Sequence, residues 1–223
     1  MNNFSWPDPP SQTAYPVARA GFPFILTASF ATAVFALLGL ATPAIVGLVV
    51  SLFICFFFRD PDRVIPNTPG ALVSPADGKI VCVEHQASSR FFDGPCNKVS
   101  IFMSVFNVHI NRVPCGGIIR DVQYFPGKFI SANLDKASED NEHNAVFLEN
   151  ESGKSVCMVQ IAGLIARRII CAVQSGNRVV AGQRMGLICF GSRVDVYLPE
   201  ETHILVKVGD KVQGGSSLIG ELP

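Results

Sequence analysis

The stretch "CFGSRVDVYLP", residues 189–199, has the pattern of a β-strand that is interrupted near its start. Apolar side chains follow a period of two residues, at Phe190, Val194, Val196 and Leu198, and would lie on one face of a strand. Such alternation is typical of a strand. A glycine weakens a strand unless a bulge, a bend or a close backbone approach requires it. The pair Gly191-Ser192 therefore needs a reason, because it sets a flexible peptide beside a hydroxyl group.

Short apolar runs of the same kind extend outward from this stretch in both directions. They occupy residues 78–85, 98–105, 116–125, 144–150, 155–163, 167–173, 185–190 and 203–208. Gly, Pro and Asn separate them, and "ENESGKS" at 149–155 predicts a hairpin turn. Residues 131–144 are predicted to be a loop with at most one helical turn. Strands at this spacing predict a mainly β fold, a sandwich or barrel, for this part of an α+β chain.

A weak internal repeat lies in the last third of the chain. "GNRVVAGQRMG" from Gly176 and "GDKVQGGSSLIG" from Gly209 share the pattern GxxVxxG. The pattern resembles the turns of lipoyl and biotinyl carrier domains, which are barrel-sandwich hybrids. Glycine-rich hairpin turns also look alike without a common architecture, and both interpretations stay open.

Residues 20–58 contain no Asp, Glu, Lys, Arg or His. A helix that spans a bilayer needs about 20 apolar residues. Pro43 is predicted to split the run into two segments near that length, which form a membrane-associated hairpin. The hairpin either spans the bilayer or dips into one leaflet. Arg19, Arg59 and Arg63 flank the run, which favours a cytoplasmic location for both ends.

A secretory signal peptide does not explain the same run. The run is too long for one apolar signal region, and no clear cleavage site with a polar start follows it. Residues 1–19, before the hairpin, are proline-rich and predicted to be irregular.

Composition excludes several classes of protein. The chain has 223 residues, of which 48% are hydrophobic and 16% charged, against about 25% charged in a typical domain. Its net charge of zero gives no basic surface for nucleic acid. The seven cysteines are scattered and never spaced as CxxC, so we expect reduced, mostly buried thiols. No cluster of His, Cys and carboxylates has the spacing of a metal site.

The pair Gly191-Ser192 permits one unusual reaction. A serine hydroxyl is a weak nucleophile until a base activates it, and glycine tolerates backbone angles that expose its carbonyl. Attack of Ser192 on the Gly191 carbonyl would turn the amide into an ester. Elimination would then leave dehydroalanine, which hydrolyses to a pyruvoyl group and ammonia. On the dipeptide alone, however, an ordinary turn or bulge is the favoured interpretation.

The surrounding motifs change that balance. They are "FFRDPDRVIP" at 57–66, "SPADGKI" at 74–80, "FMSVFNVHINRVP" at 102–114, "YFPGKF" at 124–129, "SEDNEHN" at 138–144 and "GSRVDVYLP" at 191–199. In this order they resemble the phosphatidylserine decarboxylase family, in its short membrane-hairpin form, over nearly the whole chain. The cleavage motif of that family is commonly Leu-Gly-Ser-Thr. Here Phe190 and Arg193 replace the flanking residues, while Gly191 and Ser192 are kept.

The resemblance implies a carboxy-lyase of phospholipid biosynthesis that is made as a zymogen. Autocatalytic serinolysis between Gly191 and Ser192 would give a large β chain, 1–191, and a small α chain, 192–223, within a catalytic domain of residues 59–223. The pyruvoyl group made from Ser192 would form a Schiff base with phosphatidylserine and yield phosphatidylethanolamine. No metal and no pyridoxal phosphate are implied, because the pyruvoyl ketone is itself the electron sink.

The resemblance also implies partners and a location. The substrate is phosphatidylserine, the two cleavage chains form a heterodimer, and further oligomerisation is left open. The protein is expected at the cytoplasmic face of the cell membrane, among membrane lipids and anchored by the hairpin of residues 20–58.

Two further residues match positions with roles in that family. Asp77 matches an acidic residue tied to self-cleavage, although an Asx-turn would also explain it. His109 matches a histidine near the pyruvoyl group, where an imidazole suits proton transfer. Longer members have a second histidine three positions later, and here that position is Arg112. The base for self-cleavage is therefore open between His109 and another group.

The remaining candidates are weaker. His143 is a possible base, but a surface loop is the favoured interpretation. Arg59, Arg63 and Arg112 are candidates for contact with the lipid phosphate, and the sequence does not choose among them.

Two alternative functions remain. A pyruvoyl-dependent decarboxylase of a soluble amino acid would not need the hairpin. A non-enzymatic, membrane-tethered barrel or carrier would need a modifiable lysine at a hairpin tip. The repeat turns offer only Lys211 for that role, without the usual flanking methionines.

Overall fold

The computed structural model describes residues 16–132, 140–164, 168–189 and 191–223. It divides into two compact units, which the described residues cover over 16–62 and 63–223. Most of the segment predicted to be irregular, residues 1–15, lies outside the described residues. So do residues 133–139 of the predicted loop, and Phe190.

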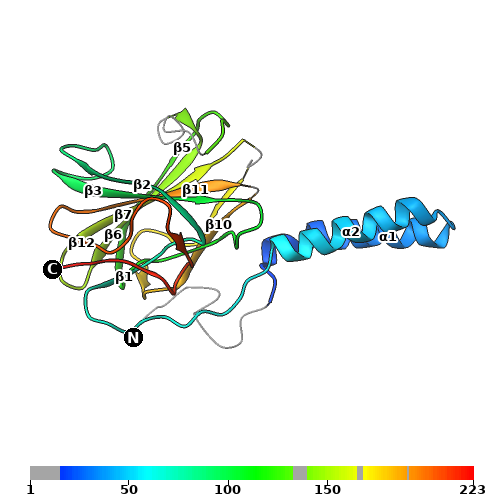
Figure 1. The fold of residues 1–223 in the computed structure, drawn as a ribbon, viewed down its shortest axis with the longest axis horizontal. Coiled ribbons are helices and arrows are strands. Elements are labelled where there is room, and N and C mark those ends of the chain that lie inside the picture. Colours follow the sequence, from blue (N-terminus) through cyan, green and yellow to red (C-terminus); the bar gives the residue numbers. More distant parts are fainter. Residues whose placement is uncertain (1–15, 133–139, 165–167, 190) are drawn as a thin grey trace. The chain divides into compact units, whose positions relative to one another are not determined.

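The first unit is a pair of apolar helices. After a 3-10 turn, Arg19–Gly21, helix α1 covers Phe22–Leu37 and helix α2 covers Ala41–Phe57, and the two lie side by side (Figure 1). Small and hydroxyl side chains mediate the contact. A Cβ on Gly47 would lie 2.5 Å from Thr32 Oγ1, and Thr32 Oγ1 lies 3.4 Å from Ser51 Oγ. Close approach over small residues is typical of helices that pack in lipid.

The prediction that Pro43 divides the apolar run is wrong. The helices are separated by residues 38–40, where Gly39 has a φ of 72°. Pro43 lies in the first turn of α2, where a backbone N–H would have no partner within the helix. Proline is tolerated there and does not break the helix.

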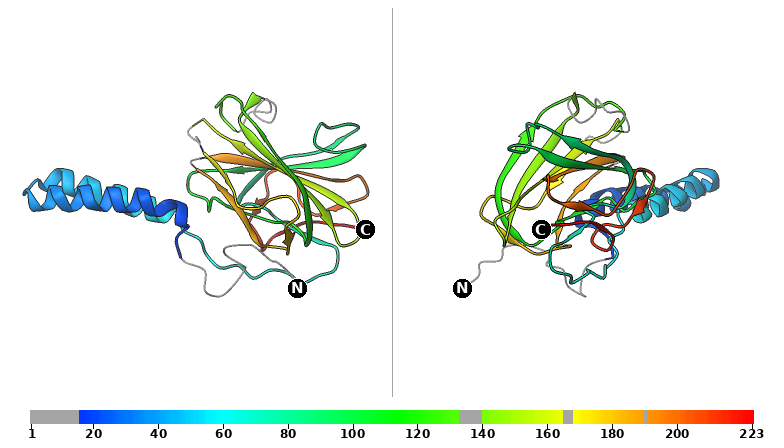
Figure 2. Two further views of the ribbon diagram at one scale, coloured as in Figure 1. Left: turned by 180° about the vertical axis from the view of Figure 1, so that it is seen from behind. Right: turned by 60° about the vertical axis from the view of Figure 1, so that its left-hand side comes forward.

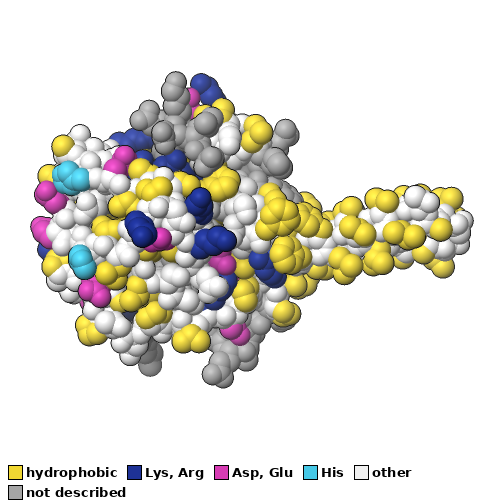
Figure 3. All heavy atoms as spheres, in the orientation of Figure 1, with side chains coloured by type: hydrophobic (Ala, Val, Ile, Leu, Met, Phe, Trp, Pro, Cys, Tyr) yellow, Lys and Arg dark blue, Asp and Glu magenta, His cyan; other side chains and the backbone are white. Residues whose placement is uncertain are grey.

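The outer surface of the helical pair is apolar. Leu26, Phe30 and Val49 are more than half exposed, and Figure 3 shows hydrophobic side chains along the visible side of both helices. Residues Arg19–Leu37 form a helix long and apolar enough to cross a membrane, with 6% of that stretch buried, and α2 is shorter. A surface of this kind suggests association with a membrane.

The second unit is built almost entirely of strands, which confirms the mainly β prediction. The strands are β1 Ala71–Val73, β2 Gly78–Gln86, β3 Cys96–Met103, β4 Ile110–Arg112, β5 Gly117–Phe125, β6 His143–Asn150, β7 Ser155–Ala162, β8 Ile169–Cys171, β9 Arg178–Val179, β10 Arg184–Ile188, β11 Ser192–Pro199, β12 His203–Ile204, β13 Lys211–Val212 and β14 Leu218–Glu221. The predicted turn at 149–155 joins β6 to β7, and Gly153 in it has a φ of 75°.

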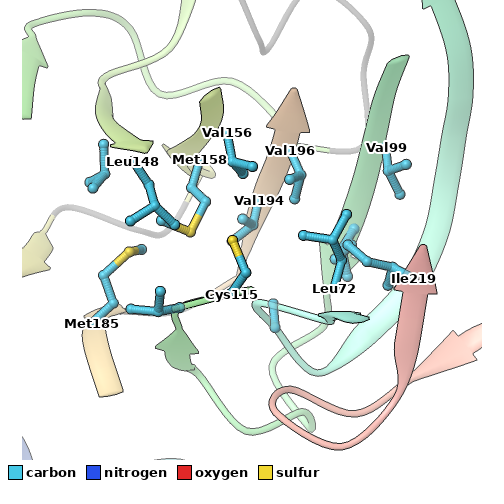
Figure 4. Packing of buried hydrophobic residues seen from close by; sticks show 14 of the residues in the cluster. Leu72, Val99, Cys115, Leu148, Val156, Met158, Met185, Val194, Val196 and Ile219 are labelled. Carbon is cyan, nitrogen blue, oxygen red and sulfur yellow. The ribbon is translucent and has the colours of Figure 1, made fainter. Parts of the chain in front are cut away.

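These strands form one large and two small sheets. The eight-stranded sheet has the order β13-β2-β3-β11-β7-β6-β5-β9, and the three-stranded sheets have the orders β1-β14-β12 and β4-β10-β8. Figures 1 and 2 show the long strands of the large sheet from three directions, twisting across the unit. The main hydrophobic core includes residues from all three sheets, among them Leu72, Val194 and Met185 (Figure 4).

Strand β11 lies in the middle of the large sheet. It pairs antiparallel with β3 over all eight of its residues and with β7 over six, and every residue in it is buried. Val194 and Val196 point into the main core, whereas Tyr197 belongs to a second cluster around Phe91. Since side chains alternate along a strand, β11 is packed on both faces.

The internal repeat corresponds to two equivalent structural units. Gly176 and Gly209 open equivalent turns, and each donates its N–H to an isoleucine carbonyl, of Ile119 and Ile80 respectively. The short strands that follow, β9 and β13, close the two opposite edges of the large sheet. The next strands, β10 and β14, are each the middle strand of a three-stranded sheet. The two GxxVxxG segments are therefore matching edge elements.

Candidate active site

Gly191 and Ser192 lie where the chain enters β11. Gly191 has a φ of 76°, in the left-handed region that only glycine adopts readily. Ser192 is fully buried and lies opposite Met103 on β3 and Ala162 on β7. Its Oγ donates a hydrogen bond to Met103 Sδ at 3.2 Å. A thioether is a weak acceptor. The bond therefore orients the hydroxyl, and little energy is needed to break it.

The carbonyl of Gly191 packs against another glycine. A Cβ on Gly163 would overlap the Gly191 oxygen and lie 3.1 Å from the Gly191 carbonyl carbon. The carbonyl therefore occupies space that exists only because residue 163 has no side chain. Gly163 is not among the residues predicted from the sequence. In the sequence Gly163 is simply a glycine at the end of the run 155–163. Its place beside Gly191 follows only from the pairing of β7 with β11.

His109 lies beside the same peptide. Its side chain is fully buried just before β4, with Nδ1 3.0 Å from the Asn107 carbonyl oxygen. Its Nε2 accepts a hydrogen bond from the Gly191 N–H at 3.3 Å. This pattern assigns the proton to Nδ1 and leaves a lone pair on Nε2. The nitrogen that can act as a base therefore faces the backbone of Gly191.

A chain of buried polar side chains extends behind Ser192. Asn111 Nδ2 donates to Met103 Sδ at 3.6 Å, Gln160 Nε2 donates to Asn111 Oδ1 at 2.9 Å, and Asn144 Nδ2 donates to Gln160 Oε1 at 3.1 Å. None of these side chains is predicted from the sequence. Amides and thioethers do not accept a proton near neutral pH, so the chain orients Ser192 and supplies no base.

The structure places Asp77 in a different set of contacts. Its Oδ2 accepts a hydrogen bond from Arg63 at 2.7 Å, and its Oδ1 accepts one from the Gly214 N–H at 2.7 Å. These bonds join the segment after the helices to the second GxxVxxG turn. They do not include His109 or Ser192, so a role of Asp77 in self-cleavage stays a prediction.

The three arginines considered for the lipid phosphate are each engaged. Arg63 pairs with Asp77, and Arg59 donates to the Phe56 carbonyl at 2.7 Å. Arg112 is 3% exposed and donates to the Gly182 carbonyl at 2.9 Å. Arg112 thus has a structural contact at the position where longer family members have a histidine.

The interpretation of His143 as a surface loop residue is wrong. It is the first residue of β6 and is 2% exposed. Nδ1 bonds to the Asn141 carbonyl, Nε2 accepts from Arg90 at 3.1 Å, and the ring stacks on Phe125. Burial lowers the pKa of His143, and the nearby charge of Arg90 lowers it further.

His143 also lies on the wrong face of the sheet for cleavage. It is opposite Ile161, which belongs to the cluster around Phe91, whereas Ser192 is opposite Ala162, on the core face. Neighbouring residues of a strand point to opposite faces. The geometry therefore favours His109 over His143 as the base.

Arg193, which departs from the family motif, is paired on the face opposite Ser192. It is 1% exposed, and its Nε donates to Asp195 Oδ1 at 2.6 Å while Nη2 donates to Ser100 Oγ at 2.8 Å. A buried charge needs such partners. The ion pair fixes the backbone immediately after Ser192.

Within the described residues, no group of three or more His, Cys, Asp and Glu side chains lies together as metal ligands would. All seven cysteines are free thiols, four of them buried. Burial raises the pKa of Cys115 to about 12, which keeps this thiol protonated and unreactive.

Comparison with known proteins gives consistent matches. The family model described as phosphatidylserine decarboxylase matches residues 50–220. The phosphatidylserine decarboxylase proenzyme of Syntrophus aciditrophicus is 49% identical over 206 residues, which cover 92% of this chain and 96% of the relative. The proenzyme of Desulfotalea psychrophila is 46% identical over 95% of this chain and 99% of the relative. That of Burkholderia pseudomallei is 49% identical over 93% and 95%.

Proposed function

The chain belongs to the phosphatidylserine decarboxylase family, and we propose that it makes its own pyruvoyl group by cleavage between Gly191 and Ser192. Its function is that of a carboxy-lyase, which converts phosphatidylserine to phosphatidylethanolamine and carbon dioxide. One observation supports the proposal above the others. Gly191 is held in a left-handed conformation with a histidine lone pair at its N–H, and a buried serine hydroxyl follows it.

The first step is an acyl shift from nitrogen to oxygen. Ser192 Oγ bonds to the carbonyl carbon of Gly191 and gives its proton to a base, for which His109 Nε2 is the best-placed candidate. The bond between that carbon and the nitrogen of Ser192 breaks, and the nitrogen takes up a proton. The product is an ester that joins the carboxyl group of Gly191 to the side chain of Ser192.

The second step divides the chain. Loss of the α-proton of Ser192 breaks its Cβ–Oγ bond and releases the Gly191 carboxylate. Water then converts the resulting dehydroalanine to the pyruvoyl group and ammonia. A ketone beside an amide carbonyl supplies the electron sink that decarboxylation requires.

In the decarboxylation itself, His109 is proposed as the proton donor. Its imidazole is buried, so water does not compete with it. Asp77 is proposed to assist cleavage through the turn that it holds, by way of its bonds to Arg63 and the Gly214 N–H.

The cleaved protein is proposed to remain a heterodimer of residues 1–191 and 192–223. The hairpin of residues 20–58 is proposed to anchor it at the cytoplasmic face of the membrane, because both helices expose apolar side chains. A carrier function finds less support, since Lys211 lies in β13, where it pairs with β2. A carrier lysine would stand at a turn.

The intact mass of the purified protein tests this proposal. We expect a large fragment that ends at Gly191 and a small fragment of 32 residues (223 − 191) that resists Edman sequencing, because a pyruvoyl group has no free amine. Ser192→Ala should remain one chain and form no phosphatidylethanolamine. A single uncleaved chain in a fully active preparation would refute the proposal.

A further inference from the structure

Three segments from different parts of the chain meet at the peptide that is proposed to be cleaved. Val105, between β3 and β4, lies 4.0 Å from the position that a Cβ of Gly191 would occupy. Gly163, after β7, contacts the Gly191 carbonyl. Arg168, before β8, accepts a hydrogen bond at its carbonyl from the Cys189 N–H at 3.1 Å. The residues next to these contacts therefore lie near the Gly191-Ser192 peptide.

Two of these segments expose large apolar side chains. Phe106 is 67% exposed and follows Val105, and Leu164 is 64% exposed and follows Gly163. The turn that carries Phe106 is firmly held, because Asn107 Oδ1 accepts hydrogen bonds from both the N–H and the hydroxyl of Ser104, at 2.9 and 2.7 Å. Phe106 is therefore presented to the surroundings by a fixed turn.

The third segment presents a cation. Arg168 is exposed. Burial raises the pKa of the Cys189 thiol, and the nearby charge of Arg168 offsets part of that rise. Among the residues that the structure describes, none pairs with the Arg168 guanidinium, in contrast to the engaged Arg63 and Arg112.

We propose that Phe106, Leu164 and Arg168 form a binding rim for the glycerophospholipid substrate in the bilayer. Arg168 binds the phosphodiester, and Phe106 and Leu164 lie against the acyl chains. Guanidinium groups match the oxygens of a phosphate, and aromatic and aliphatic side chains beside basic residues are typical of surfaces that enter the lipid interface. This inference rests on the proposed function and adds to it the residues that recognise the substrate.

The position of Arg168 suits the shape of the substrate. In phosphatidylserine only the short serine carbon chain separates the reacting amine from the phosphate. A residue that binds the phosphate must therefore lie close to position 192. Arg168 meets this requirement through its backbone bond to Cys189, three positions before Ser192. Apolar contacts to the acyl chains belong farther out, which agrees with the greater exposure of Phe106 and Leu164 compared with the buried Ser192.

The test uses the full-length cleaved enzyme and two substrates that share one head group. One is phosphatidylserine in phosphatidylcholine vesicles, and the other is glycerophosphoserine, which has the phosphate but no acyl chains. The variants are Phe106→Ser with Leu164→Ser, Arg168→Glu, and Arg168→Gln, which removes the charge without reversing it. The matched controls are Val208→Ser, which is 59% exposed in the wild type, and Arg178→Glu on the edge strand β9. Complete self-cleavage of each variant reports that it has folded.

The rim predicts a different result for each substrate. Both Arg168 variants should raise KM about tenfold or more for both substrates, because a charged hydrogen bond to the phosphate is lost in each. The double Phe106 and Leu164 variant should raise KM for vesicles by about tenfold or more and leave KM for glycerophosphoserine within about twofold of wild type. The two control variants should match the wild type on both substrates.

Two results would contradict the proposal that these residues form a binding rim. In the first, the rim variants behave like the Val208 and Arg178 controls. In the second, the Arg168 variants are impaired on vesicles alone, which would show a general attraction to the membrane surface and no phosphate contact. Failure of the proposed function is distinguishable from both, since the wild-type enzyme would then decarboxylate neither substrate.

Discussion

The tautomer of His109 is set on the side of the ring that faces away from Gly191. Because Nδ1 donates to the Asn107 carbonyl, the lone pair stays on Nε2, which faces Gly191. The turn of residues 104–107 thus orients the imidazole as well as presenting Phe106. In this tautomer Nε2 can accept a proton during the proposed self-cleavage, and the imidazolium form can donate a proton from Nε2 during decarboxylation.

His109→Ala should therefore slow both steps. Loss of general acid–base catalysis typically lowers a rate by about 10²–10⁴-fold. Gel analysis over time measures cleavage, and phosphatidylethanolamine formation measures the second step. His85→Ala is the control, since half of the His85 side chain is exposed. A variant that cleaves normally but makes little product would restrict His109 to decarboxylation, and normal rates of both would remove it from the mechanism.

Gly163→Ala should block self-cleavage in a folded protein. The added methyl group would displace the Gly191 carbonyl that Ser192 must attack, and misplacement of a reacting group by about 1 Å can lower a rate about 10²-fold. The matched control is Gly117→Ala, which creates the same kind of overlap with the Glu149 carbonyl, between β5 and β6. Cleavage and thermal unfolding are measured for both variants.

The response to hydroxylamine, which cuts esters, identifies the step that is blocked. Because Gly163→Ala should stop the reaction before the ester forms, the uncleaved protein should resist hydroxylamine. Equal loss of cleavage in both glycine variants, in proportion to their loss of stability, would argue against a specific role for Gly163.

At the scale of elements, both faces of β11 carry residues next to the candidate site. Ser192 points to the core face, while Arg193 points to the other face and pairs with Asp195 and Ser100. Lys98 lies 3.8 Å from Asp195 and also contacts Glu84, so the pair is embedded in a wider set of charges. The ionic contacts on one face adjoin Ser192, the residue proposed to react, on the other.

Removal of one partner of this ion pair should destabilise the fold strongly. Asp195→Leu would leave the buried charge of Arg193 without its carboxylate, which typically costs about 3–5 kcal/mol. The double variant Arg193→Met with Asp195→Leu should be less destabilised than Asp195→Leu alone, because no buried arginine charge remains. Denaturant unfolding of the Ser192→Ala background measures both, in an uncleaved chain. Equal stability of the single variant and the wild type would show that the pair is not buried in solution.

The long strands could be predicted from the sequence because each has its own apolar alternation. The short strands β1, β4, β9, β13 and β14 could not, since their two to four residues are fixed by pairing with distant segments. The site divides in the same way. Family motifs in the sequence predict Gly191, Ser192 and His109, whereas Met103 and Gly163 are brought to the proposed site only by the register of β3 and β7 against β11.

At the scale of the whole molecule, the chain combines two units suited to different surroundings. Helices α1 and α2 expose apolar side chains around a contact made by small residues, whereas the β unit has its own two hydrophobic clusters. The Gly191 and Ser192 contacts described above all come from residues 63–223. The chemistry and the proposed anchor are therefore separable in the sequence.

Deletion of residues 20–58 should release the protein from membranes while self-cleavage continues. Sedimentation with membranes and gel analysis of the two fragments measure the two properties in one preparation. The full-length protein is the control for sedimentation, and Ser192→Ala in the shortened chain is the control for cleavage. If the shortened protein still sediments completely, another surface supplies the main attachment.

Because β11 lies in the middle of the large sheet, the precursor and the cleaved protein should differ in how they refold. The 32 residues that follow the proposed cut include β11, which is inserted between β3 and β7, and β12, β13 and β14, which pair with each other or with β1 and β2. The uncut chain brings these strands together as neighbours on one polymer, but after the cut two separate molecules would have to meet. Heated precursor should therefore refold at a rate independent of dilution, whereas heated mature enzyme should recover less as it is diluted. The proposed cleavage would thus convert a folding equilibrium that is independent of concentration into an assembly that depends on it.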